Sequence, residues 1–258
     1  MNQWICQETG LSIVEGPVSM YRVSSNRPDR GPLAPPPRPS NPFTERQSWS
    51  RFDVGQSSVA AGPGLTIYGA TRRDTAFVEV LAWKAATTAT YSKLVEEAMF
   101  TGSSIDELLN ELHGLGVPIG GVSLEWRLER EIYTLETDVC RWIDLTDRRS
   151  ISALRALIGS WHSQPVTASI LTGDQRQVTT RIAETLRTCG LLRPDGTHTT
   201  ASGIKYASKF GTLGNDDHCW AQWLDAYNTG ATITYSEPMD PADPDVIEAV
   251  KHMGCFVP

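Results

Sequence analysis

Short strand-like and helix-like segments alternate along this chain without a regular repeat, and this irregular order most restricts the folds that it can adopt. Apolar, strand-like runs lie at Val18–Ser24, Leu65–Ala70, Trp142–Leu145, Gly203–Ser208 and Trp220–Leu224. Helical patterns lie between them at about 75–100, with one break, and at 104–112, 150–159 and 174–189. Because a doubly wound sheet needs a regular strand–helix rhythm, the order predicts an α+β fold with a mixed or antiparallel central sheet and flanking helices.

Proline dominates the segment 26–44, with Pro28, Pro32, Pro35, Pro36, Pro37, Pro39 and Pro42. Each proline removes a backbone donor and fixes φ, which predicts an extended loop, either wrapped over the surface or bound by a proline-recognising partner. After Asp225 the composition turns to Asp, Pro and Thr, and we expect an extended tail over 226–258. The 258 residues are enough to bury a full core. We expect a single domain over 1–258, with its core at about 18–225.

The charge and cysteine content narrow the function classes. The chain carries a net charge of −7 and a pI of about 5.3, whereas general nucleic-acid binding needs a basic surface, so we expect no nucleic-acid partner. Its five cysteines are odd in number and lack a C-x-x-C spacing, so neither a metal site nor a disulfide framework is indicated.

Residues 1–10 lack a signal-peptide pattern, and no apolar stretch approaches the ~20 residues that span a bilayer. We expect a cytoplasmic protein with no membrane partner.

Glu79 is the charged residue whose surroundings are most unusual. In a helix, its neighbours three and four positions away are Thr75, Ala76, Ala82 and Trp83, and none of them carries a charge. A carboxylate on such a face loses hydration and needs compensation, which is typical of a functional group. A solvent-facing glutamate or a structural ion pair would produce the same sequence.

Two arginines and a serine are weaker candidates. Arg51 lies between Trp49 and Phe52, where aromatic neighbours can bury its stem while the guanidinium faces a phosphate. Arg22 follows Tyr21 in an apolar strand, with the same two interpretations: a phosphate ligand or a stacked surface arginine. Ser208 ends the strand that begins at Gly203, and a serine in that position is usually a local cap.

Four separated segments together resemble the RES-domain family. Met20–Val23 resembles the opening strand of that family, and Ser50–Asp53 its arginine segment. Ile67–Ala70 followed by Ala76–Glu79 is similar to its Tyr-then-Glu strand–helix unit, and Gly203–Lys209 to the late strand that ends in its serine. The Arg, Glu and Ser that give the family its name match Arg51, Glu79 and Ser208. The chain departs from the pattern in having Trp49 and Ser50 where glycines are usual, a longer gap from Arg51 to Tyr68, and a segment at 96–136 that looks inserted.

The resemblance implies a fold similar to ADP-ribosyltransferases and a toxin of a toxin–antitoxin system that degrades NAD⁺. NAD⁺ is then the substrate, with no prosthetic group. The resemblance implies that Arg22 and Arg51 face the pyrophosphate, Tyr68 and Ser208 contact the ribose or its neighbours, and Glu79 stabilises the oxocarbenium-like sugar. The chain has no G-x-G-x-x-G motif for redox use of NAD. Two alternatives stay open: a mono-ADP-ribosyltransferase that modifies a protein, and a non-catalytic module that binds a protein or nucleotide.

The acceptor and the partner are also implied rather than derived. Hydrolysis uses water, whereas phosphorolysis uses inorganic phosphate as co-substrate, for which Lys205 and Lys209 are candidate ligands. Many ADP-ribosyltransferases place a second carboxylate two residues before the catalytic glutamate, and this chain has Phe77 there. We therefore rank small acceptors above protein transfer. The family resemblance also implies a small Xre-type antitoxin as partner.

Overall fold

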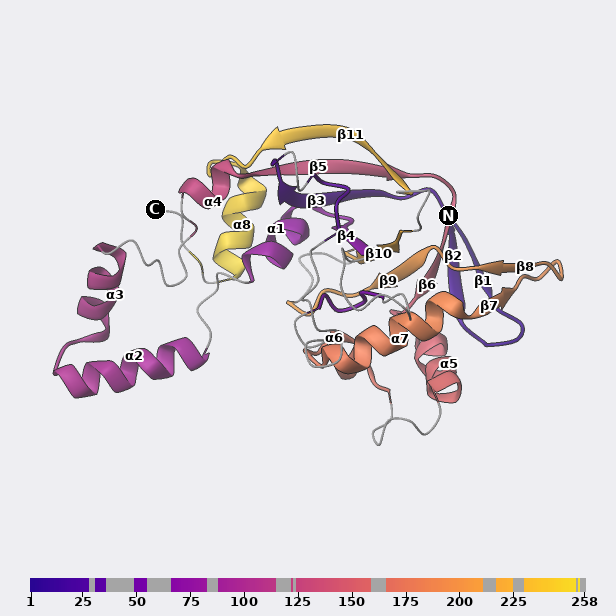
Figure 1. Ribbon diagram of the computed structural model, residues 1–258, viewed down its shortest axis with the longest axis horizontal. Coiled ribbons are helices and arrows are strands. Elements are labelled where there is room, and N and C mark those ends of the chain that lie inside the picture. Colours follow the sequence, from indigo (N-terminus) through magenta and orange to yellow (C-terminus); the bar gives the residue numbers. More distant parts are fainter. Residues whose placement is uncertain are drawn as a thin grey trace.

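The computed structural model describes residues 1–27, 31–35, 49–54, 66–82, 88–114, 122, 124–158, 166–210, 217–224, 230–253 and 255. Most of the proline-rich segment 26–44, with its expected extended course, lies outside the described residues. The described part forms a large sheet with helices beside it (Figure 1). The predicted α+β class is confirmed.

Within the described residues, nine strands make the main sheet in the order β1-β2-β6-β9-β10-β4-β3-β5-β11. Their bounds are β1 Asn2–Ile5, β2 Ser12–Gly16, β3 Ser19–Ser25, β4 Thr66–Ala70, β5 Arg130–Thr137, β6 Cys140–Asp144, β9 Gly203–Tyr206, β10 Cys219–Trp223 and β11 Ala231–Pro238. Neighbouring strands are antiparallel except β6 and β9, which are parallel. A separate ribbon pairs β7, Gly190–Leu192, with β8, His198–Thr200. The sheet is therefore mixed, as predicted.

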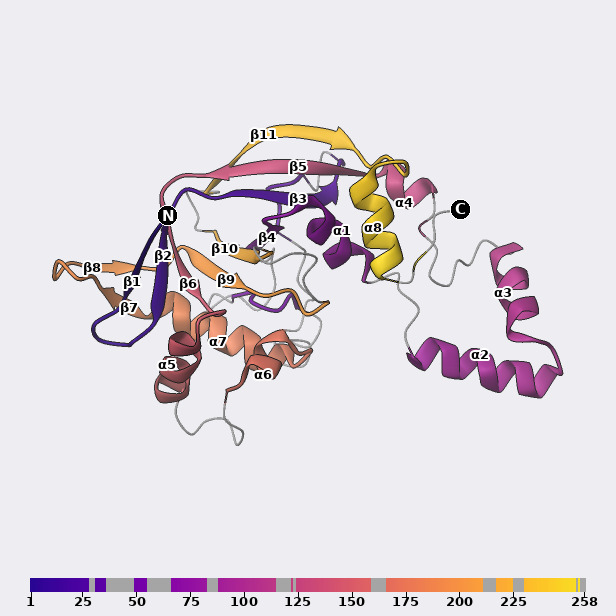
Figure 2. The same ribbon diagram turned by 180° about the vertical axis from the view of Figure 1, so that it is seen from behind.

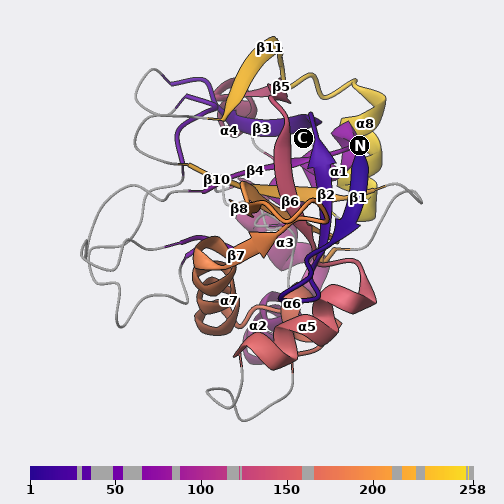
Figure 3. The ribbon, with the colours of Figure 1, turned by 90° about the vertical axis from the view of Figure 1, so that its right-hand side faces the viewer.

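The helices form three groups, apart from α4, which contacts β5. Their bounds are α1 Arg73–Leu81, α2 Thr88–Thr101, α3 Ile105–Gly114, α4 Leu124–Leu128, α5 Arg148–Ile158, α6 Ala168–Thr172, α7 Arg176–Thr188 and α8 Pro244–His252. Helices α5, α6 and α7 lie together beside β6 and β9, while α1 and α8 pack on each other near β3 (Figure 1, Figure 3). Helices α2 and α3 contact each other and stand apart from the sheet (Figure 2).

The apolar faces of these elements form two cores, one on each side of the sheet. The larger core includes Phe77 of α1, Ile182 of α7 and Ile204 of β9, all fully buried. The smaller core is built around Trp142 of β6 and Trp220 of β10, whose rings meet edge to face with centroids 5.0 Å apart. Burial of such aromatic surface is a main source of stability. Because the central strands are covered on both faces, they hold side chains in fixed positions.

Helices α2 and α3 have a small apolar cluster of their own, formed by Leu94, Ala98 and Leu108. A capping box begins α3: the backbone N–H of Ser104 donates to Glu107 at 2.7 Å and the N–H of Glu107 donates back to Ser104 at 3.2 Å. These helices fall within the segment 96–136 that looks inserted by comparison with the RES family. Met99 of α2 stays 81% exposed, so this pair is not buried against the main cores.

Both ends of the chain differ from the sequence-based expectation. Residues before 18 were expected outside the core, yet β1 and β2 extend the sheet and Ile13 is fully buried. The C-terminal residues, expected as an extended tail, instead form β11, which pairs with β5, and the helix α8. Asp243 caps α8 through the N–H of Asp245, and Val246 is fully buried. The ends are therefore parts of the fold.

No helix in the described part of the chain is both long enough and apolar enough to cross a membrane.

Candidate functional site

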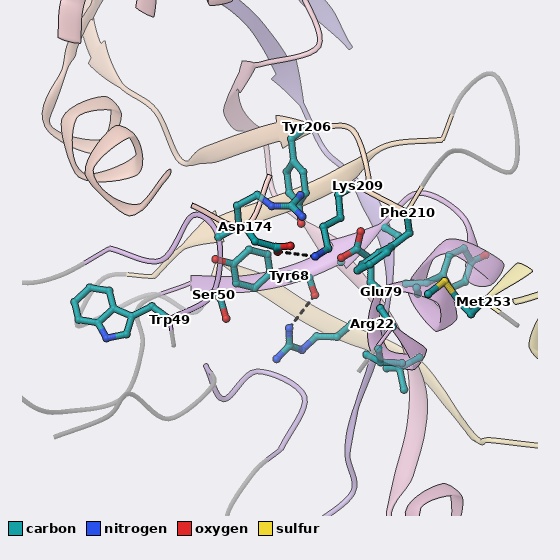
Figure 4. Close-up of a pocket in the computed structure, with 18 of the residues that line it drawn as sticks. Arg22, Trp49, Ser50, Tyr68, Glu79, Asp174, Tyr206, Lys209, Phe210 and Met253 are labelled. Atoms are coloured by element: carbon teal, nitrogen blue, oxygen red, sulfur yellow. Dashed lines mark hydrogen bonds and ion pairs between the residues drawn. The ribbon is translucent and has the colours of Figure 1, made fainter. Parts of the chain in front are cut away.

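A cavity of about 560 Å³ opens beside β3, β4 and α1 (Figure 4). It is lined by Tyr21, Arg22, Val23, Trp49, Ser50, Arg51, Tyr68, Gly69, Ala70, Ala76, Glu79, Val80, Ala82, Asp174, Arg176, Tyr206, Lys209, Phe210 and Met253. The volume falls within the range of roughly 300–1,000 Å³ that is usual for small-molecule sites. A mostly apolar wall with a few convergent charges is the usual composition of such a site.

The cavity lies where the sheet loses its regular pairing. Strand β3 pairs with β5 along its whole length, from Ser19 to Ser25, but with β4 only at Tyr21 and Ala70. Arg22 occupies the gap between the strands, since its Nη1 donates to the backbone oxygen of Tyr68 at 2.8 Å. Nη2 of Arg22 also donates to the oxygen of Ala34 at 3.2 Å. A side chain thus supplies a hydrogen bond that a strand neighbour would otherwise make.

Glu79 reaches the cavity from α1 and is half-buried. The Ser208 hydroxyl donates to its Oε1 at 2.6 Å, and the Cys219 thiol lies 3.7 Å from the same oxygen. Burial, followed by the charge of Glu79, raises the pKa of the Cys219 thiol well above its usual value, so this cysteine stays protonated. The carboxylate is therefore held in one orientation by neutral donors.

Helix α1 is fixed in place at its first turn. Arg73 forms ion pairs with Glu237 of β11 and with Asp243 and Asp245 at the start of α8. These contacts join α1 to the C-terminal elements. Because Glu79 lies less than two turns further along α1, the same contacts help to position its carboxylate.

Arg51 is deeply buried, with a residue exposure of 6%. Its guanidinium carbon lies 5.6 Å from the centre of the Tyr206 ring. The neighbouring Phe52 is fully buried and meets the same ring edge to face, with centroids 4.9 Å apart. Nε and Nη1 of Arg51 are buried without a hydrogen-bond partner among the described residues. Unpaired buried donors of this kind need an explanation, and an anionic ligand would supply one.

Tyr68 and Tyr206 supply aromatic walls. The hydroxyl of Tyr68 accepts a hydrogen bond of 3.0 Å from the backbone N–H of Phe52, which ties the arginine segment to β4. Burial raises the pKa of both tyrosines well above 10, so both rings remain neutral phenols. Figure 4 shows Tyr68 and Glu79 within the same cavity.

Three charged residues of the cavity were given no role, or only a weak one, by the sequence. Lys209 donates to Asp174 at 2.6 Å, and this hydrogen bond lowers the pKa of the Asp174 carboxyl (Figure 4). Arg176, at the start of α7, also donates to Asp174, at 3.2 Å. An arginine in the first turn of an amphipathic helix resembles an ordinary solvated charge, so the sequence carried no signal for Arg176. Its side chain is nevertheless only 14% exposed.

The structure brings most of the predicted residues together. Arg22, Arg51, Tyr68 and Glu79 all line the cavity. Ser208 is outside that lining, and its hydroxyl contacts Glu79 instead. Glu79 and both predicted arginines therefore converge on one cavity.

Of the two lysines proposed as phosphate ligands, only one lines the cavity. Lys205 is bonded to the buried Asp144 at 3.1 Å and is not part of the lining, whereas Lys209 is. Phe77, at the position of the second carboxylate of many ADP-ribosyltransferases, is fully buried in the larger core.

Comparisons with known proteins leave the family open. No protein-family model matches the chain, and no curated protein matches it. Among solved structures, the chain is similar to one in the crystal structure of the M. tuberculosis MbcT–MbcA toxin–antitoxin complex, with a TM-score of 0.46 and 12% identity. That match covers 89% of this chain and 88% of the other. A similarity at this level assigns no function, so the function has to be argued from the residues of the cavity.

Proposed function

We propose that this chain cleaves the bond between nicotinamide and ribose in NAD⁺. The observation that carries the proposal is the convergence of the Glu79 carboxylate with buried, unpaired arginine nitrogens of Arg51 in one cavity. A dinucleotide presents a diphosphate for the arginine and a sugar for the carboxylate. The aromatic rings of Tyr68 and Tyr206 line the same space and suit a stacked base or nicotinamide.

In the proposed reaction the bond between C1″ of the ribose and the nicotinamide nitrogen breaks and its electron pair leaves with nicotinamide, whose ring nitrogen becomes neutral. The sugar becomes oxocarbenium-like, and the negative charge of Glu79 stabilises it. Water adds its oxygen to C1″ and releases one proton to solvent, which gives ADP-ribose. Ser208 and Cys219 both contact Oε1 of Glu79, and we assign the other oxygen, Oε2, to the ribose. Ser208 then acts as a positioning residue.

Small acceptors suit this cavity better than a protein side chain. The position two residues before Glu79 is the buried Phe77, so no carboxylate at that position orients a protein acceptor. Water and inorganic phosphate both fit the proposal, and Lys209 is the lysine of the pair that lines the cavity. Product masses with and without phosphate distinguish them: ADP-ribose identifies a hydrolase and ADP-ribose-1″-phosphate a phosphorylase.

The experiment that tests the proposal is incubation of the purified protein with NAD⁺, followed by chromatography for nicotinamide. We expect nicotinamide to appear in proportion to NAD⁺ lost. Intact NAD⁺ after prolonged incubation of folded protein, with water and phosphate both supplied, would contradict the proposal.

We also propose that the chain acts as a toxin with an antitoxin partner, because loss of NAD⁺ stops growth. Expression should arrest bacterial growth, and Glu79→Gln should relieve the arrest. The Xre-type partner is tested by co-expressing the product of the adjacent gene and measuring NAD⁺ cleavage. Full NAD⁺ cleavage in the presence of that product would contradict the proposed antitoxin partner without affecting the proposed cleavage activity.

A further inference from the structure

Besides Arg22, two arginines from distant parts of the chain line the cavity: Arg51 and Arg176. Arg51 precedes β4, and Arg176 is the first residue of α7. The two lie close enough that the charge of Arg51, after burial itself, lowers the pKa of Arg176. Two positive charges held together repel each other, and a bound anion removes that repulsion.

Both arginines have unused donors. Nε and Nη1 of Arg51 and Nη1 of Arg176 are buried and find no hydrogen-bond partner within the described ranges. Nη2 of Arg176 donates to Asp174. The side chain of Asp174 is 68% exposed and also accepts from Lys209. Since charged, planar donors of this kind prefer phosphate or carboxylate oxygens, the unused nitrogens mark an anion site.

The start of α7 strengthens the site. This helix has 13 residues, and its N-cap, Gln175, makes no side-chain capping bond. The positive end of the helix dipole favours a phosphate at this position. Because Arg176 lines the cavity, the first turn of α7 lies at its wall.

Arg22 differs from these two arginines in its terminal nitrogens. Both of them already donate to backbone oxygens, those of Tyr68 and Ala34, and only its Nε is buried without a partner among the described residues. Releasing them to bind a ligand would leave two carbonyl groups without their partner, at a cost. Arg22 of β3 therefore has a structural role, because it bonds to the backbone of β4 where the two strands are not paired.

We propose that Arg51 and Arg176 together bind the diphosphate of the dinucleotide, and that Arg22 does not. This inference rests on the proposed function for the identity of the dinucleotide. A diphosphate carries one negative charge on each phosphate, which matches the two guanidinium groups. Inorganic phosphate shares the same chemistry and is the second source that the test must separate.

The test is calorimetric titration of the full-length protein with ADP, which has the diphosphate but no nicotinamide bond to cleave. We expect Arg176→Gln to weaken ADP binding by about 10- to 100-fold, the range for losing a charged hydrogen bond. Arg176→Lys should recover part of that loss. Arg181→Gln is the matched control, because Arg181 is an exposed arginine on the same helix and is not part of the cavity lining. Its ADP affinity should equal that of the wild type.

Three further arms complete the experiment. Arg22→Gln should keep ADP affinity within about threefold while its urea midpoint falls, since removing its hydrogen bonds leaves backbone oxygens unpaired. Arg176→Gln should unfold at the same urea concentration as the wild type or a higher one, since a like-charge contact is lost. Titration with inorganic phosphate alone should give weaker binding than ADP.

Unchanged ADP affinity in Arg176→Gln would overturn the inference, as would equal losses in Arg181→Gln. Phosphate that binds as tightly as ADP would overturn the diphosphate assignment. The same measurements distinguish this inference from the proposed function. If NAD⁺ stays intact while ADP binding depends on Arg176, the diphosphate site is supported and the cleavage activity is contradicted. If NAD⁺ is cleaved but Arg176→Gln has wild-type kcat/KM, the cleavage activity is supported and the diphosphate site is contradicted.

Discussion

The two edges of β3 show how this fold makes room for a ligand. On one edge, β3 pairs with β5 from Ser19 to Ser25 without interruption. On the other edge it pairs with β4 at one position, Tyr21–Ala70, and the cavity opens beside that position. The continuous edge stabilises the sheet, while the interrupted edge exposes polar groups that side chains and, we propose, a ligand must satisfy. The β3–β5 edge therefore contributes mainly to stability, whereas the β3–β4 edge provides the space for the proposed ligand.

The largest effect on stability is expected away from the interrupted β3–β4 edge, at Gly203 of β9, a strand that is paired on both sides, with β6 and β10. A Cβ atom there would lie 2.3 Å from the backbone oxygen of Ala221 and 2.7 Å from the Trp142 ring. Because neither neighbour can move freely in a packed sheet, Gly203→Ala should lower the free energy of unfolding by about 3 kcal/mol. Urea unfolding measures this. Gly190→Ala is the matched control, since nothing lies within 4 Å of its added Cβ, and it should differ from wild type by less than about 0.5 kcal/mol.

A smaller loss is expected where α1 is tied to the C-terminal elements. Arg73→Ala removes three ion pairs that are only partly buried, so solvent screening limits the effect to about 1 kcal/mol. The loss should shrink as salt is added. Arg149→Ala, which removes the exposed pair with Asp147, should cost less than half as much. Equal losses for the two variants would show that Arg73 does not fix α1.

The smallest effect should come from helices α2 and α3, which stand apart from the sheet. Ser104→Ala removes the hydroxyl bonds of the α3 capping box and keeps the backbone bond to Glu107; it should speed amide exchange in the first turn without changing nicotinamide release. Hydrogen bonds from Ser104 lower the pKa of Glu107 below its ordinary 4.5. The cap is therefore fully present above pH 4.5 and is lost as the pH falls through the lowered value. A fall in nicotinamide release in Ser104→Ala would link α3 to the cavity.

The sequence predicts elements best where burial is strong. The strands around Ile67, Ile204 and Trp220 and the helix that carries Ile182 all lie close to their expected places, because their apolar residues repeat at the period of the element. Strand β11 was missed although Ala231, Ile233 and Tyr235 alternate with polar residues, because the Asp, Pro and Thr around it favoured a tail. Helix α8 did carry a signal, Asp243 and Pro244 at its start, but the abundance of Asp and Pro around it favoured a tail.

The site was less predictable than the fold. Spacing alone could not place Arg51 and Glu79 in one cavity, because they line it together only after β4, β9 and α1 are assembled; the family resemblance supplied that association. Arg176 was missed because a buried arginine and a solvated one look alike in a helix start. Ser208, expected to contact the substrate, lies outside the cavity lining and donates to Glu79, a distinction that depends on side-chain direction.

The most direct test of the account is a parallel measurement of binding and turnover in Glu79→Gln. This change keeps the shape of the side chain and its ability to accept from Ser208, but removes the charge that stabilises the sugar cation. We predict that NAD⁺ affinity by calorimetry stays within about threefold of the wild type, while nicotinamide release falls by at least about 100-fold. A Glu79→Gln protein that releases nicotinamide at the wild-type rate would contradict the account.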